Sequence, residues 1–204
     1  MTAVALLTLF TATTSFGQNE EIRQTFTIGP AVGFGHSRIV NVGYDEYFKP
    51  SWNAGVTMNY SKWEHIGISG DILYSAEGGN FKTNQGSEID VDLTYLRIPL
   101  KFAYFFGDVQ NNFRPKITVG PSFGFLIDDD LDKETGAANP NLSDSENYKT
   151  LDLGGQASLG FNLKLGERVW LNTDLYYYYG FLEIDDLAHT NNNFGLRVGV
   201  AFGL

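Results

Sequence analysis

Apolar residues recur at every second position along several long stretches of this chain, and this period of two constrains the fold more than any other feature. In the stretch 151–165, Leu159 and Leu163 belong to the apolar series, and Ser158 and Asn162 belong to the polar one. Successive side chains of a β-strand point to opposite faces, whereas a helix repeats every 3.6 residues. The clearest runs, at 52–61, 151–165 and 193–204, therefore predict strands with one apolar and one polar face.

Weaker copies of the same pattern lie between these runs, at 26–37, 66–75, 94–104, 115–127 and 169–181. The eight segments are roughly 10–15 residues long, whereas ordinary strands have about 5–6. Strands of this length can cross a bilayer at a tilt. An even number of long strands is typical of a closed up-and-down barrel. We therefore predict an all-β chain that forms an eight-stranded antiparallel up-and-down transmembrane β-barrel.

The size of the side chains indicates which face points outward. The apolar series is bulky on nearly every strand, and eight strands enclose only enough space to be filled by side chains. The small and polar series fits inside, together with Tyr176 and Tyr178. A soluble, lipocalin-like barrel would have the opposite sense and remains the alternative.

Charged residues of the inward series also have candidate partners of opposite sign, as buried charges require. Asp71 is predicted to lie beside Arg97 or Lys101, and Asp174 beside Arg197. The predicted structural charge network of the lumen comprises Asp71, Arg97, Lys101, Asp174 and Arg197.

The connections between the predicted strands alternate between long and short. The long links are 39–49, 77–90, 128–149 and 183–191, and the short ones are 62–65, 106–113 and 166–167. Outer-membrane barrels pair long external loops with short periplasmic turns. The long links carry formal charges of −1, −2, −5 and −3, and together they are more negative than the whole chain, whose net charge is −10. The acidity therefore belongs to one end of the barrel, which is expected to face outward.

Length, charge and composition narrow the remaining choices. A chain of 204 residues suits one domain. The net charge of −10 argues against nucleic acid as a partner, and the lack of cysteine excludes disulfides and thiol chemistry. Residues 1–17 have a short apolar core followed by small residues, which predicts a cleaved secretory signal before a barrel domain at 18–204. The signal has no basic start, so the natural N-terminus could lie upstream of Met1.

Six short motifs resemble the PorT-like outer-membrane β-barrel family of Bacteroidota. They lie at 29–33, 54–56, 70–75, 94–100, 119–124 and 195–199, and the most specific is the pair Leu73-Tyr74-Ser75 and Tyr95-Leu96-Arg97-Ile98-Pro99-Leu100. The chain departs from the family at Arg97, where many members have an acid. The resemblance implies an outer-membrane location and an eight-stranded barrel. Some PorT-type members are linked to type IX secretion, but this role cannot be transferred to this chain residue by residue.

The sequence gives little support for a metal-binding or catalytic site. The acidic run that starts at Asp128 lacks the glycine and the final glutamate of an EF-hand loop, so we interpret it as a solvated loop. A nucleophilic site at the rim would need His36 or His189 beside a hydroxyl, but His36 and Ser37 are adjacent on a strand and point to opposite faces. We predict no catalytic, metal or cofactor site.

The sequence therefore predicts a non-enzymatic outer-membrane barrel with a filled polar lumen and acidic external loops. Envelope integrity, adhesion and secretion-system assembly are the candidate roles, with outer-membrane lipids and envelope or secretion-system proteins as partners. A soluble periplasmic barrel that binds an apolar ligand, or a rim-site hydrolase or acyltransferase, is the alternative.

Overall fold

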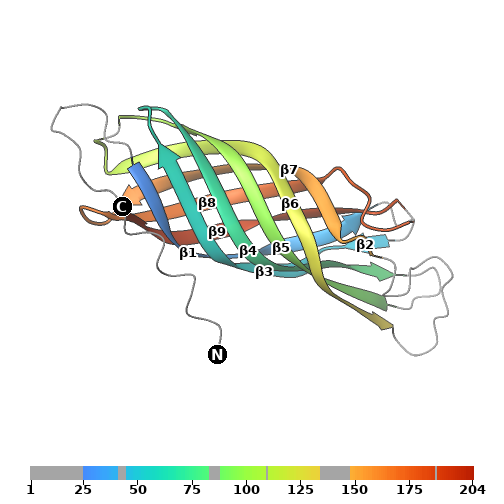
Figure 1. The fold of residues 1–204 in the computed structure, drawn as a ribbon. Coiled ribbons are helices and arrows are strands. Elements are labelled where there is room, and N and C mark those ends of the chain that lie inside the picture. Colours follow the sequence, from blue (N-terminus) through green and yellow to red (C-terminus); the bar gives the residue numbers. More distant parts are fainter. Residues whose placement is uncertain (1–24, 41–44, 83–87, 109, 134–147, 187) are drawn as a thin grey trace, which may run out of the picture.

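The computed structural model describes residues 25–40, 45–82, 88–108, 110–133, 148–186 and 188–204. Their strands are tilted around a single barrel (Figure 1). In chain order they are β1 (Thr25–Val40), β2 (Asp45–Tyr47), β3 (Lys49–Ser61), β4 (Ile66–Lys82), β5 (Glu88–Phe105), β6 (Phe113–Lys133), β7 (Leu151–Lys164), β8 (Val169–Gly180) and β9 (Thr190–Gly203). The predicted signal segment 1–17 lies outside the described residues.

The barrel closes where its first and last strands pair. Each long strand pairs antiparallel with the next one along the chain, and β1 pairs with β9, so that Thr27 lies opposite Gly203. The short β2 continues the line of β3 beyond Phe48 and pairs with the far part of β4. The result is a closed ring of eight long antiparallel strands, which confirms the predicted fold class. Among the described residues, no helix is long and apolar enough to cross a membrane.

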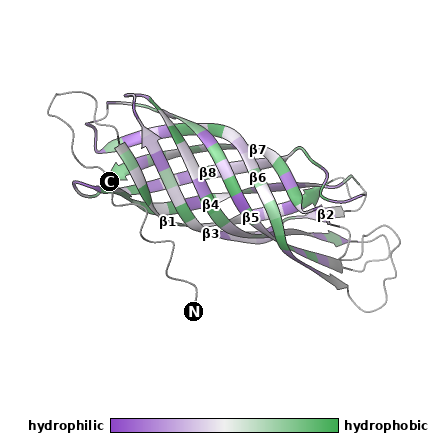
Figure 2. Cartoon of the chain, in the orientation of Figure 1, coloured by the Kyte–Doolittle hydropathy of each residue, from purple (hydrophilic) through white to green (hydrophobic). Residues whose placement is uncertain are grey.

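Polar side chains face the lumen and apolar ones face outward, as predicted. On β7, Leu159 is 63% exposed whereas its neighbour Ser158 is 5% exposed. The alternation is visible as bands of hydrophilic and hydrophobic colour along each strand (Figure 2). This sense is opposite to that of a soluble barrel with an apolar ligand inside, and it leaves a broad apolar wall on the outside.

Three strands extend far beyond their predicted ends. β4 continues to Lys82, β5 begins at Glu88 and β6 continues to Lys133, so the predicted links 77–90 and 128–149 are wrong over these residues. The predicted links 39–49 and 183–191 are also wrong in part, because β2 lies within the first and β9 begins at Thr190 in the second. The acidic run from Asp128 to Asp130 is therefore strand and not loop. Residues 83–87 and 134–147 of these links lie outside the described residues.

The extensions went unpredicted because the sense of the alternation reverses in them. On β5, Leu100 and Phe102 are exposed while Lys101 is buried. Beyond Thr94 the buried side chains are Val91 and Leu93, and Asp92 is exposed. An apolar interior with a charged exterior is what a barrel in water requires, so the reversal marks where the membrane-facing wall ends.

A bulge lies at the same level. The β5–β6 register shifts between Thr94, which faces Asp128, and Tyr95, which faces Leu126. One additional residue, Ile127, is thereby inserted in β6. Such a bulge changes the twist of the strand and the direction of the side chains that follow.

The outer wall allows a depth test of membrane insertion. Leu159→Arg should destabilise the folded barrel by about 2–4 kcal/mol, because the cation would lie at the level of the hydrocarbon core, whereas Leu165→Arg near the short-turn end should cost about 0–1 kcal/mol. Both leucines are more than half exposed, and Leu159 lies on β7 while Leu165 directly follows its last residue. Unfolding titrations in liposomes measure the difference, and equal costs would contradict the assignment of the outer wall.

Candidate functional site: the lumen and its mouth

The middle of the lumen holds five charged residues, which we call the mid-lumen cluster: Asp71, Lys101, Lys116, Asp174 and Arg197. Asp71 Oδ2 accepts hydrogen bonds from Lys101 Nζ and from Arg197 Nη1, each at 2.8 Å. Asp174 Oδ2 lies 3.0 Å from Lys116 Nζ. All five residues are at least nine-tenths buried. Removing one partner of such a pair would leave a buried charge without its counter-charge, so the pairs stabilise the fold only while both partners are present.

A second group, the mouth cluster, lies nearer the end with the long links and comprises Glu77, Arg97 and Asp152. Arg97 binds Glu77 through two parallel hydrogen bonds, from Nε at 2.5 Å and from Nη2 at 2.6 Å. Nη2 also donates to Asp152 Oδ2 at 2.7 Å. This fork geometry is the strongest form of the arginine–carboxylate contact.

Neighbouring side chains complete the mouth cluster. Tyr178 donates to Asp152 Oδ1 at 2.6 Å, and Asn191 donates to Glu77 Oε2 at 2.6 Å. The Arg97 guanidinium lies 4.0 Å from the centre of the Tyr178 ring. A Cβ atom at Gly124 would lie 2.9 Å from Arg97 Nη1, so glycine at this position leaves room for the guanidinium.

The five residues predicted for the lumen all lie in it, but only one of the predicted pairs is formed as proposed. Asp71 binds Lys101. Arg97 binds Glu77 and Asp152 in place of Asp71. Arg197 lies beside Asp174 in the strand register but binds Asp71. Sequence reasoning missed Glu77, Lys116 and Asp152, although the inward parity of Asp152 was a usable signal.

A layer of buried apolar side chains, which we call the apolar cap, lies in the lumen between the mouth cluster and the long-link end. Ile184, in the link between β8 and β9, is fully buried in it. The fully or nearly fully buried members are Ile39, Phe81, Val91, Leu93, Tyr95 and Ile184. The cap thus places apolar side chains across the long-link end of the lumen.

The β8–β9 link that carries Ile184 is held by a buried pair. His189 Nδ1 contacts Asp185, and the His189 backbone N–H donates to Asp185 Oδ1 at 3.2 Å. Nearby, Tyr148 packs against the cap. Burial, with the carboxylates of Asp185 and Asp129, raises the pKa of the Tyr148 hydroxyl well above its ordinary value. Through its two contacts with Asp185, His189 holds the β8–β9 link in place.

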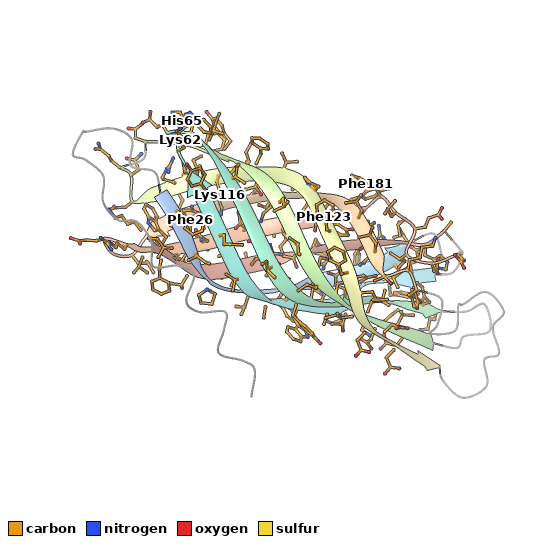
Figure 3. The ribbon with its side chains drawn as sticks, viewed as in Figure 1. Phe26, Lys62, His65, Lys116, Phe123 and Phe181 are labelled. Carbon is orange, nitrogen blue, oxygen red and sulfur yellow. The ribbon has the colours of Figure 1, made fainter. Side chains whose placement is uncertain are left out.

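The other predicted rim residues do not converge on a reactive group. His36 stacks on Phe194 on the outer wall, with ring centroids 5.6 Å apart, while Ser37 is fully buried on the opposite face. His65 lies with Lys62 in a short turn at the far end from Phe181 (Figure 3). In the described part of the chain, no group of three or more acidic or histidine side chains has the arrangement of a metal site.

The exposed side of the long-link end is acidic. Asp92 lies opposite Asp130 in the β5–β6 register, and Lys49 bridges Asp92 at 2.7 Å and Asp90. Partial burial, with the neighbouring charges of Asp128 and Asp130, raises the pKa of Asp129. This end therefore presents concentrated negative charge to the solvent.

Comparison with known proteins gives one family and several structural neighbours. The family model described as "Outer membrane protein beta-barrel domain" matches residues 16–186. The outer membrane protein OprG from Pseudomonas aeruginosa is similar over 90% of this chain and 96% of its own, with 17% identity and a TM-score of 0.56. Neisserial surface protein A is similar over 88% of this chain and 97% of its own, with 14% identity and a TM-score of 0.52. A search of curated proteins finds no match. At identities this low, the structural likeness shows a common fold alone.

Proposed function

Because the chain belongs to the outer membrane protein beta-barrel domain family, we propose that it is a non-enzymatic, non-conducting barrel of the outer membrane whose acidic end serves as an external binding surface. The outer-membrane location follows from the family and the fold. The lack of enzymatic activity, the closed lumen and the external binding role are the parts that we propose.

The filling of the lumen carries the proposal. The apolar cap, the mouth cluster and the mid-lumen cluster lie one below another along the barrel, and each is buried. Eight strands enclose a space that side chains can fill completely. A solute would have to break ion pairs such as Arg97–Glu77 and displace apolar side chains such as Phe81 to pass.

Conductance in planar bilayers tests this proposal. The purified protein should give no stable ohmic steps. A porin of known conductance, inserted in the same bilayers, is the positive control. Reproducible porin-like steps from the unmodified protein would overturn the proposal.

The external role rests on the acidic strand extensions. A rigid barrel that raises β4, β5 and β6 above the membrane wall provides a fixed surface, and such exposed surfaces carry most binding specificity. Adhesion, envelope integrity and assembly of a secretion system all use a surface of this kind. The resemblance to the PorT-like family favours assembly of envelope or secretion-system proteins as the finer role, with basic partner surfaces that match the acidic carboxylates.

A further inference from the structure

We propose that an apolar groove on the outer wall of the barrel, which ends at Arg38, binds one phosphorylated lipid of the outer leaflet, with an acyl chain in the groove and the phosphate on Arg38. The inference goes beyond the proposed function, and its test does not depend on the conductance result.

The groove has a volume of about 690 Å³. It crosses a row of side chains that face each other on successive strands: Val119 on β6 lies opposite Ala157 on β7, which lies opposite Tyr177 on β8. The small side chain of Ala157 forms a low point between larger neighbours. Leu159 and Leu175, which also line it, are 63% and 57% exposed. The inward-facing residues Thr118, Ser158 and Tyr176 also border the groove, but its exposed leucines open it toward the lipid.

The groove slants from the middle of the outer wall toward the long-link end. Its first end, at Ile117 on β6, lies opposite Leu159 of β7, and its last, at Arg38, lies near the end of β1 at the long-link end. Four strand spacings separate β6 from β1 around the barrel, a distance of roughly 19 Å. A slot of this length along an apolar wall suits a single extended acyl chain.

Arg38 is the only charged residue among the described ones that line the groove, and it lies at the end nearest the long links. The Arg38 guanidinium lies 5.0 Å from the centre of the Phe48 ring, and both residues line the groove. A cation placed at the edge of the apolar wall attracts an anionic headgroup. The fork of a guanidinium matches phosphate oxygens in particular.

An unpartnered polar group lies beside this arginine. Asn192 on β9 lies opposite Arg38 in the register, lines the groove, and is only 5% exposed. Its Oδ1 is buried and accepts no hydrogen bond. Because an unsatisfied buried acceptor destabilises the protein, a headgroup hydroxyl that donates to it would be favoured. A phosphorylated, hydroxyl-bearing headgroup on acyl chains satisfies both Arg38 and Asn192.

Native mass spectrometry in detergent tests the inference with diphosphorylated lipid A as the probe and its dephosphorylated form as the comparison. The unmodified barrel should retain one lipid A molecule and much less of the dephosphorylated form. Arg38→Gln, which removes the cation, and Ala157→Phe, which fills the groove, should each reduce the retained fraction at least tenfold.

Two matched variants serve as controls. Arg168→Gln removes an exposed cation at the opposite end, and Ala54→Phe enlarges an outward alanine on β3, away from the groove. Both should retain lipid A like the unmodified protein. Heat-modifiable gel mobility reports folding, and if Ala157→Phe fails to fold, Arg38→Gln decides the result. Undiminished retention in Arg38→Gln, or a groove-dependent dimer in place of a lipid adduct, would overturn the proposal.

Discussion

Arg97→Met is expected to destabilise the barrel by about 3–5 kcal/mol, because it leaves two buried carboxylates without their cation. Glu77 and Asp152 are both essentially inaccessible to solvent, and each accepts a hydrogen bond from the guanidinium. Methionine matches much of the volume of arginine but supplies no donor. The loss should appear as a lower urea midpoint when the protein unfolds from liposomes.

A compensating variant separates the effect of charge from that of packing. Glu77→Gln/Arg97→Met/Asp152→Asn removes all three charges and should recover most of the lost stability, because uncharged amides are far less costly to bury than unpaired carboxylates. Lys164→Met, a conservative change at the short-turn end of β7, should have little effect. If Arg97→Met costs no more than Lys164→Met, the mouth cluster does not stabilise the barrel.

The wall of the barrel could be predicted from the sequence because every strand obeys the same local rule. An apolar side chain such as Leu159 must face lipid, its neighbour Ser158 must face the lumen, and the period of two then fixes the rest of the strand. The closure of the barrel and its eight long strands followed from counting such segments.

The ion pairs could be predicted only in part, because several cross the lumen. Sequence reasoning looked for partners on neighbouring strands, which holds for Asp71 on β4 and Lys101 on β5. Lys116 on β6, however, reaches Asp174 on β8, and Arg97 on β5 reaches Asp152 on β7. In so narrow a barrel, side chains from strands that are not adjacent meet at the axis, and parity alone does not show which ones do.

The apolar cap escaped prediction for a different reason. Its members Val91 and Leu93 have the inward parity, which sequence reasoning had assigned to polar residues. Above the membrane the surroundings change from lipid to water, so the same strand needs the opposite sense. A reversal of sense along an alternating segment is the signal that would have located both the cap and the end of the membrane wall.

Single cysteines should show which end of the barrel faces outward, since the chain has no cysteine of its own. Asp186→Cys lies in the β8–β9 link, where the native side chain is 82% exposed, and Glu167→Cys lies in the exposed short turn between β7 and β8. A maleimide that does not cross membranes should label Asp186→Cys on intact cells and Glu167→Cys only after the outer membrane is opened. The contrast should be nearly all or none.

This orientation is expected because outer-membrane barrels place short turns in the periplasm and longer connections outside. It would also place Asp92, Asp128 and Asp130 where divalent cations and basic partner proteins can reach them, and Arg38 at the level of the outer-leaflet headgroups. Equal labelling of both cysteines after opening the membrane confirms that both proteins are folded and present. Labelling of Glu167→Cys alone on intact cells would show that the barrel has the opposite orientation in the membrane. The acidic end would then face the periplasm and could bind only periplasmic partners.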